Sequence, residues 1–483
     1  MENLWANLDL HLDLDLDGPR VGRSLEDALR AAVRDGRLPP GTRLPATRVL
    51  AADLGIARNT VGGVYAQLTA EGWLTARTGA GTWVSGVPGH GVPPPAAWPA
   101  KSANQPANQL SNSAPGHAES LVSGGPGYDL HPGVPDLSAF PRRDWLAATR
   151  KALSAAPDHA LDYPDPRGLP PLRGALAGYL ARVRGALVSP ERTLVTAGFK
   201  HSLAILSTAL RARGAVTIAV EAYGLPVHRD VMTGTGLRLA PLPLDGEGAV
   251  PDDNGAGAVL LTPAHQFPLG MTLAPGRRRQ FAEWAAATGG MIVEDDYDGE
   301  FRYDRHPVGA MQALAPEHVV YGGTASKALA PGLRIGWLAV PARLLDEVLD
   351  AARVLGGGPD TITQLALAEF LTSGAYDRQV RLARLGYRRR RDELAAALSA
   401  RVPGARVTGI SAGLHAVVEL PPGQTEDEAI ASAARHGVAV YALSWCAAGG
   451  AARRPPSLVV GYGGPPGHAF TTAVARLCAA LSA

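Results

Sequence analysis

A lysine, an aspartate and a tyrosine stand in an order that can hold a carbonyl cofactor. Asp295 and Tyr297 follow the apolar run 291–293, and Lys327 follows the apolar run 319–321. A buried lysine titrates readily and can form a Schiff base. Pyridoxal phosphate (PLP) needs such an amine and an acidic partner for its pyridine nitrogen. We therefore expect Lys327 to bind PLP, Asp295 to face the pyridinium, and Tyr297 to donate to the phenolate oxygen.

The phosphate of PLP needs several further donors, and neighbouring residues can supply them. Thr324 and Ser326 precede the lysine, and Arg334 follows it by seven residues and can bind phosphate as a charged fork. A second group stands where a helix is expected directly after a strand, because free backbone N–H groups at a helix N-terminus attract anions. The candidates in this second group are Gly198, Phe199 and Lys200.

The two apolar runs have the composition of buried strands in a parallel sheet. Open α/β sheets bind their ligands at the carboxyl ends of such strands, where these polar residues stand. Strand-end aspartates and surface lysines are common singly, so it is their combination in this order that indicates a cofactor site. Further strands are expected at 193–198, 216–220 and 259–262, which predicts an α/β fold.

Residues 18–86 have the element order of a winged helix. Helices are expected at 24–34, with Ser24 as N-cap, at 47–54, and from after residues 57–60 to about 71, followed by two short strands around 78–81. The region carries nine arginines against five acidic residues, a net charge of +4. This favours a DNA-binding domain, and a small helical domain that binds protein is the alternative.

Two segments resemble known families. EDDYDGEFRY followed by GTASKALAPGLRIGW resembles the fold-type I aminotransferase module of MocR-type regulators, and 36–84 resembles GntR-type winged helix-turn-helix domains. MocR-type regulators join these two modules, and the resemblance covers nearly the whole chain. It implies an N-terminal winged helix-turn-helix, a fold-type I PLP-dependent aminotransferase-like three-layer α/β/α domain, and a small C-terminal α+β domain.

The resemblance also implies which residues meet double-stranded DNA. These are Arg43, Arg48, Arg58, Asn59, Thr60, Gly79 and Gly81. Arg48 and Arg58 would meet phosphates or base edges, and the glycine wing would reach the minor groove. Recognition helices read bases from their N-terminal end, and arginine is the commonest specific reader. The glycines at 62–63 are unusual, since each costs about 1 kcal/mol in a helix interior.

The segment 263–270 replaces an Asn-Pro-Thr-Gly turn of other aminotransferases and is distinctive of MocR-type proteins. The resemblance places His265 or Gln266 on the phenolate side of PLP, and a purely structural histidine is the alternative. Where the family usually stacks a tyrosine on the PLP ring, this sequence has Leu225, with Tyr223 two residues earlier.

One position separates a regulator from an enzyme. Amino-acid aminotransferases bind the substrate carboxylate with an arginine, and the matching position here is Val459. Lys327 and its partners still permit the first half of transamination. We therefore expect a PLP-dependent DNA-binding transcriptional regulator that senses PLP or an amine or amino-acid effector. The alternative is an active aminotransferase with an ancillary DNA-binding domain.

The expected organisation is a winged helix at 18–86, a linker at 87–127 rich in Pro, Gly, Ser, Asn and Ala, and a PLP-binding domain at 128–483. The fold implies a homodimer in which Tyr163 can point into the partner's site, and an aromatic residue of a turn without that role is the alternative. No apolar run approaches a membrane-spanning length, and two cysteines suit a reducing cytoplasm. No metal site is expected. The family's themes are control of vitamin B6 synthesis and of amine catabolism.

Overall fold

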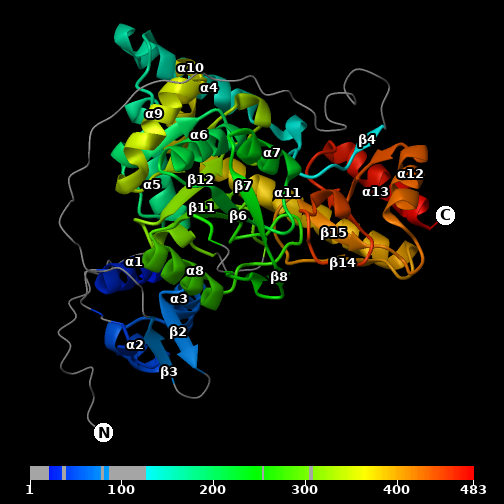
Figure 1. Cartoon of the computed structure of the whole chain (residues 1–483), viewed down its shortest axis with the longest axis horizontal. Coiled ribbons are helices and arrows are strands. Elements are labelled where there is room, and N and C mark those ends of the chain that lie inside the picture. The colour runs from blue at the N-terminus through cyan, green and yellow to red at the C-terminus, as the bar shows by residue number, and fades with distance from the viewer. Residues whose placement is uncertain are drawn as a thin grey trace.

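The computed structural model describes residues 21–34, 38, 40–77, 81–85, 127–252, 255–303 and 308–482. A small N-terminal part packs against one end of a large α/β part, and the C-terminal elements form a third group at the side (Figure 1). Nearly all of the expected linker at 87–127, and the expected wing tip at 78–80, lie outside the described residues.

The N-terminal part is a winged helix with a three-stranded antiparallel sheet in the order β1-β3-β2. Its elements are α1 (Val21–Arg34), β1 (Arg43–Leu44), α2 (Thr47–Leu54), α3 (Arg58–Ala70), β2 (Leu74–Arg77) and β3 (Gly81–Val84). Helix α2 ends, as predicted, at Gly55, whose left-handed φ of 66° suits glycine. The expectation that Ser24 caps α1 is wrong: the helix begins three residues earlier, and Ser24 lies inside it.

The large part is built on a seven-stranded sheet in the order β5-β13-β12-β11-β10-β6-β7. Only β13 in this sheet runs antiparallel to its neighbours. The strands are β5 (Thr193–Thr196), β6 (Thr217–Glu221), β7 (Arg238–Leu242), β10 (Ala258–Leu261), β11 (Met291–Asp296), β12 (Val319–Thr324) and β13 (Gly336–Ala339). The two predicted apolar strands are neighbours, with Ile292 opposite Val319, so their polar ends open at one edge.

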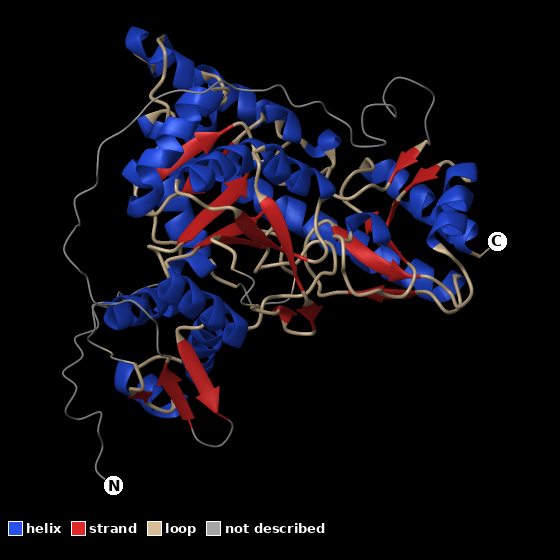
Figure 2. Cartoon of the chain, in the orientation of Figure 1, coloured by secondary structure: helices blue, strands red, loops and turns tan. Residues whose placement is uncertain are grey.

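Helices cover both faces of this sheet, which confirms the predicted three-layer α/β/α fold (Figure 2). The helices of the large part are α4 (Arg142–Ala155), α5 (Pro170–Arg184), α6 (Phe199–Ala212), α7 (Pro226–Gly234), α8 (Pro275–Thr288), α9 (Leu345–Leu355) and α10 (Thr361–Thr372). A short hairpin of β8 (Leu244–Asp245) and β9 (Gly248–Ala249) lies beside them. In the described part of the chain, no helix is long and apolar enough to cross a membrane.

The long helix α11 (Ala375–Arg401) leads into the small C-terminal domain, which has the predicted α+β composition. Its antiparallel sheet has the order β14-β15-β18-β17. The remaining elements are β14 (Arg406–Thr408), β15 (His415–Glu419), α12 (Glu426–Arg435), β16 (Val438–Ala439), β17 (Tyr441–Ala442), β18 (Ser457–Gly461) and α13 (Gly467–Leu481). Strand β4 (Tyr128–Asp129) pairs with β16, so the segment that opens the large part packs against this domain.

The winged helix and the large part share one apolar cluster. Leu314 packs against Gly72, directly after α3. Gly309 lies so close to Glu71 that an added Cβ would stand 2.7 Å from its carboxyl carbon. Glu71 is buried and held by Arg30 of α1, with Nη2 and Oε1 2.7 Å apart. The segment around 308–315 therefore forms the surface on which the winged helix docks.

Candidate cofactor and DNA sites

The expected cofactor residues meet in one cavity of about 480 Å³ at the carboxyl edge of the sheet. Asp295 ends β11 and Lys327 stands in the turn after β12, so the strand pairing brings both to one opening. The Lys327 amine contacts the Gly133 carbonyl oxygen. Loss of water around the amine lowers the pKa of Lys327, against the opposing effect of Asp298 and Asp295. A lowered pKa makes the amine a better nucleophile at neutral pH.

Asp295 carries the clearest sign of a missing partner. Its side chain is 4% exposed, and Oδ1 has no hydrogen-bond partner within the described residues. Burial is the main cause that raises the pKa of Asp295 well above its usual value. A buried carboxylate oxygen without a donor is costly. The N–H of a protonated pyridine ring in this cavity would satisfy it.

A row of three polar side chains stands behind this cavity. The Tyr297 hydroxyl lies 3.2 Å from His265 Nδ1, and that nitrogen lies 2.8 Å from Asp298 Oδ2. Tyr297 lines the cavity, whereas His265 is only 2% exposed and does not line it. The Gln266 side chain bonds the Tyr223 and Phe267 carbonyls instead. His265 therefore reaches the cavity through Tyr297.

His265 and Asp298 also belong to a cluster that the sequence reasoning did not find. Together with His415 they place one ligand atom each within 4.8 Å of one another. Each is engaged within the protein, because His415 Nε2 lies 3.1 Å from the Pro268 carbonyl oxygen and His265 pairs with Asp298. The burial of His415 lowers its pKa to about 3, so this ring is neutral at pH 7.

The expected phosphate donors lie close to one another in the same cavity. Thr324, Ser326 and Arg334 line it, and the two hydroxyl oxygens are 2.8 Å apart. Gly198 has a φ of 90°, and an added Cβ would stand 3.6 Å from the Arg334 guanidinium. Helix α6 begins at the next residue, Phe199, so its free N–H groups open here. The exposed Lys200 does not line the cavity.

Several cavity residues were missed by the sequence reasoning, among them Glu221, Thr262 and His228. Glu221 and Thr262 stand at the ends of β6 and β10, where the strand-end rule could have found them, and Thr262 donates to Glu221 at 2.5 Å. His228 lies on α7, with Nδ1 3.8 Å from Asp295 Oδ2. Burial, with smaller effects from Lys327 and other cations, lowers the pKa of His228 to about 4.

Leu225 and Tyr223 both line the cavity. The Tyr223 hydroxyl donates to the Ala452 carbonyl oxygen at 2.9 Å, which directs this end of the side chain toward the C-terminal domain. Leu225 immediately precedes α7. An aliphatic side chain therefore stands where the family usually has the tyrosine that covers the ring.

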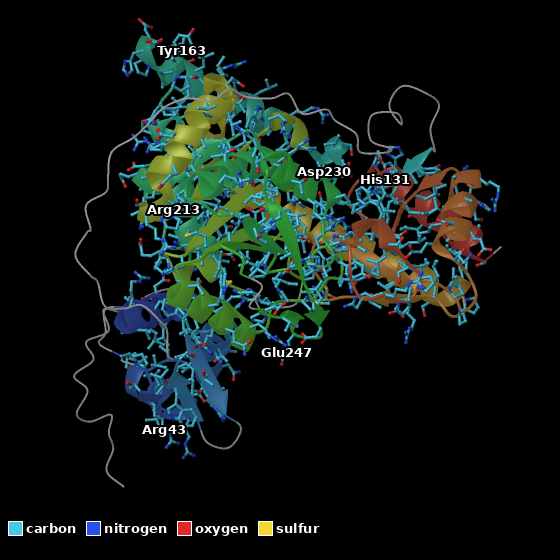
Figure 3. All side chains as sticks on the ribbon, in the orientation of Figure 1. Arg43, His131, Tyr163, Arg213, Asp230 and Glu247 are labelled. Carbon is cyan, nitrogen blue, oxygen red and sulfur yellow. The ribbon has the colours of Figure 1, made fainter. Side chains whose placement is uncertain are left out.

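The winged helix presents its expected DNA residues on its surface. Arg48, Arg58 and Asn59 are exposed, Thr60 is half-buried, and α3 begins at Arg58. The Arg43 guanidinium lies 5.6 Å from the Trp83 ring centre, and its side chain projects away from the large domain (Figure 3). Gly81 has a φ of 126°, whereas Gly79 lies outside the described residues.

The fold and the two sites define a winged-helix protein with an aminotransferase-like, PLP-binding domain. Residues 22–84 match the family of bacterial regulatory proteins of the gntR type, and residues 131–456 match aminotransferase class I and II. The residues present fit PLP, since they offer an amine, a carboxylate oxygen without a donor, and an arginine at a helix N-terminus. When bound, PLP supplies a ring aldehyde that exchanges one primary amine for another.

The chain is similar over most of its length to named regulators. It is 33% identical to the HTH-type pyridoxine biosynthesis transcriptional regulator PdxR of Corynebacterium glutamicum, over 90% of this chain and 91% of that protein. It is 34% identical to the probable rhizopine catabolism regulatory protein MocR of Rhizobium meliloti, over 79% and 77%. The chain belongs to the MocR-type family of HTH-type transcriptional regulators, which confirms the predicted family.

Solved structures of enzymes share the fold of the large domain. An aspartate aminotransferase of Thermus thermophilus, a single mutant, is 26% identical with a TM-score of 0.63, covering 75% of this chain and 94% of its own. An archaeal alanine:glyoxylate aminotransferase has a TM-score of 0.68 at 24% identity, and the match covers 75% of this chain and 93% of that enzyme's chain.

Proposed function

We propose that this DNA-binding regulator reports the state of its PLP site by changing its affinity for an operator. The effector is PLP itself or an amine, and the protein acts as a homodimer in the cytoplasm. The winged helix comprises residues 18–86, the linker comprises residues 87–127, and the PLP-binding domain comprises residues 128–483. The observation that carries the proposal is the unpartnered Oδ1 of Asp295 facing the same cavity as Lys327.

In this proposal each cavity residue has one task. Lys327 holds the cofactor covalently, and Asp295 keeps a proton on the ring nitrogen of the cofactor. Tyr297 donates to the phenolate oxygen, and His265 orients that hydroxyl. The phosphate is held by a group of donors in the cavity, namely Gly198, Phe199, Thr324, Ser326 and Arg334. Gln266 keeps the loop in shape through its bonds to backbone carbonyls.

Strand β11 supports a route from this cavity to the winged helix. Glu294, next to Asp295, accepts the backbone N–H groups of Met311 and Gln312 at 2.8 and 2.9 Å. These residues stand in the docking segment, and Leu314 packs against Gly72. A shift at the end of β11 would therefore displace the docking surface.

The other neighbour of Asp295 supports a second route. Asp296 is paired with the buried Arg184, with Oδ2 and Nε 2.6 Å apart. The Arg184 carbonyl accepts the backbone N–H of Ala310 at 2.8 Å. The next residue, Gly185, lies beside Arg30 of α1, where an added Cβ would stand 3.6 Å from the guanidinium. Hydrogen bonds as far as Ala310, and then the close approach of Gly185 to Arg30, thus join the cofactor strand to the docked domain.

Exposed apolar side chains at the end of the molecule where Tyr163 projects support contact with a second copy of the chain (Figure 3). Tyr163 is 99% exposed, and Leu161, two residues before it in the chain, is more than half exposed. Apolar groups collected on one surface mark an interaction site. A homodimer formed here would bring Tyr163 toward the partner's cavity.

The test is the DNA affinity of purified protein with its cofactor present, removed and restored. A DNA fragment obtained by binding selection serves as the probe, and fluorescence anisotropy measures the dissociation constant. We expect the constant to change by about tenfold, the size of a typical coupling between two sites. Equal affinity with and without PLP, and with every amine tried, would refute the proposal.

Transamination is the second candidate, because the four residues Lys327, Asp295, Tyr297 and Arg334 are all present in the cavity. Against it, Val459 is fully buried in an apolar cluster and offers nothing to a substrate carboxylate. A bidentate guanidinium there would fix the substrate over the ring. We expect no sustained turnover with amino acids and 2-oxo acids. Turnover on the order of 1 per second or more would put the enzyme first.

A further inference from the structure

We propose that the effector is a primary amine that bears an aromatic group and has no carboxylate beside its nitrogen. This inference rests on the proposed function, because it names the class of ligand that shares the cavity with PLP. It is carried by three features of the cavity: an apolar wall, a row of adjacent tilted rings at the C-terminal domain, and the use of its arginines elsewhere.

The cavity wall is mainly apolar. It is formed by side chains from both domains, among them Val134, Leu225, Val227, Met232, Phe267 and Leu414. A charged group placed against such a wall would lose its water without gaining a hydrogen bond. An aromatic or aliphatic group would instead gain the free energy of burial.

Three adjacent rings, tilted by 30° and 34° to one another, extend this wall at the C-terminal domain. The ring centres of His131 and Tyr441 are 4.1 Å apart, and those of Tyr441 and Trp445 are 4.5 Å apart. Tyr441 and Trp445 line the cavity and are half-buried. Burial raises the pKa of Tyr441 to about 12, so its hydroxyl stays neutral at pH 7. Ring faces at these spacings form a surface that a further aromatic ring can join.

The two arginines that line the cavity have other roles. In the proposed PLP site, Arg334 binds the phosphate. The Arg229 guanidinium donates to three backbone carbonyls, those of Gly224, Cys446 and Ala447, at 2.9 to 3.2 Å. It therefore holds the loop that carries Trp445 and presents the ring row.

Two further basic residues near the cavity, His228 and Arg454, do not offer a positive charge to a carboxylate in the cavity. The pKa of His228, lowered to about 4, makes that ring neutral at pH 7. Arg454 lies over the outer side of Tyr223 and donates to the Leu244 carbonyl at 3.3 Å. Within the described residues, an α-carboxylate in this cavity would meet apolar side chains where an aminotransferase has its arginine.

The experiment uses full-length protein loaded with PLP and four ligands: 2-phenylethylamine, ethylamine, L-phenylalanine and 4-aminobutyrate. Calorimetry and the visible absorbance of bound PLP give each dissociation constant. We expect 2-phenylethylamine to bind at least about tenfold tighter than each of the other three. Equal or tighter binding of a carboxylated ligand, or no binding of any amine, overturns the proposal.

Variants at the ring row separate recognition from folding. Trp445→Ala should lose the preference for 2-phenylethylamine over ethylamine, while ethylamine binding and the PLP absorbance stay unchanged. Trp445→Phe should keep most of the preference, since a ring remains. Leu385→Ala, an exposed residue of α11, is the matched control and should bind like the wild type. A preference that survives Trp445→Ala overturns the assignment of the ring row.

The measurement of DNA affinity is independent of the measurement of ligand binding. Ligand selectivity without any change in DNA affinity would support the ligand class and refute the proposed regulation. A change in DNA affinity that follows 4-aminobutyrate or L-phenylalanine, but not 2-phenylethylamine, would support the regulation and overturn the ligand class.

Discussion

Lys327 and Asp295 are a base and an acid that are both buried, and one cofactor would stabilise both of them. Enclosure lowers the pKa of the lysine and raises that of the aspartate, because burial disfavours the charged form of each group. A cationic pyridine ring beside Asp295 and an aldehyde beside Lys327 would remove both penalties.

The first prediction concerns the covalent link. Lys327→Ala removes the amine, so purified protein should lose the visible absorbance of covalently held PLP and keep its far-ultraviolet circular dichroism. Lys151→Ala, at an exposed lysine of α4, should leave the spectrum unchanged. A Lys327→Ala protein with the wild-type spectrum would show that another residue holds the cofactor.

The second prediction concerns the charge beside the ring nitrogen. Asp295→Asn keeps the shape of the side chain and removes its charge. A hydrogen bond to a charged group contributes about 1.5–3 kcal/mol, so the dissociation constant of PLP should rise by about ten- to a hundredfold. Equilibrium dialysis of cofactor-free protein measures this constant. Asp230→Asn, at an exposed aspartate of α7, is the control and should change nothing.

Sequence reasoning found the site residues that follow β11 and β12, but it missed Glu221 and Thr262 at two other strand ends and His228 on a helix. Asp295, Tyr297, Lys327 and Arg334 were found because strand-end polarity is visible in the sequence, and the cavity brings all four together. His228 was missed because nothing in a helix pattern shows that its first turn faces a ligand. The pairing of His265 with Asp298 depends on a loop and a strand end 33 residues apart, a contact that periodicity does not reveal.

At the scale of elements, helix α3 is the clearest case of local and tertiary preferences in conflict. It runs as a helix through Gly62 and Gly63, although each glycine disfavours helix. Buried Val61, Val64 and Leu68 anchor one side of it. An added Cβ at either glycine would meet no atom within 4 Å, so packing does not require glycine there.

The third prediction follows from this free space. Gly63→Ala should stabilise α3 by about 1 kcal/mol, measured as slower amide hydrogen exchange in the helix. Gly55→Ala is the matched opposite, because a φ of 66° disfavours alanine, and it should destabilise the same domain by about 1 kcal/mol or more. Effects of the same sign in both variants would contradict this account.

The fourth prediction tests the N-terminal turn of α3 as the DNA reader. Arg58→Ala should weaken specific DNA binding by about 1–3 kcal/mol, roughly five- to more than a hundredfold, and leave the PLP spectrum unchanged. Binding of the wild type should fall steeply with salt, because phosphate contacts release counterions. Arg389→Ala, an exposed arginine of α11, serves as control. Unchanged operator affinity in Arg58→Ala would exclude this role.

Most elements could be predicted because their patterns are local. The predicted helix 47–54 and the apolar strands around 291–293 and 319–321 are all present, although both strands extend three residues further. The start of α1 was misplaced because Ser24 has the chemistry of a cap but lies within a longer helix. Short elements such as β1 and β4 depend on pairing with distant strands, so no local pattern reveals them.

At the scale of the whole molecule, the arrangement of the domains was beyond prediction. Arg30 and Glu71 form a buried ion pair although they are 41 residues apart in the chain. Gly309, which packs against Glu71, lies in the other domain. None of these residues carries a motif. Their importance can be recognised only from their proximity in the folded protein, where Glu71 leaves no room for a side chain at Gly309.

The last prediction uses this close contact to separate docking from both sites. Gly309→Ala places a Cβ 2.7 Å from the Glu71 carboxyl carbon, which Arg30 holds in a buried position. The two surfaces must then move apart. Since neither Lys327 nor Arg58 is altered, we expect the variant to keep its PLP absorbance and its ability to bind DNA.

What Gly309→Ala should lose is the dependence of DNA affinity on PLP or amine, because the route from β11 reaches the winged helix through this segment. Anisotropy titrations with and without ligand measure that dependence, and amide exchange in α1 and at Gly72 reports undocking. Gly386→Ala on α11, where an added Cβ meets no atom within 4 Å, should respond to ligand like the wild type. A ligand response that persists in an undocked Gly309→Ala protein would mean that the signal travels by another route. The segment 308–315 would then be a structural support and not a coupling element.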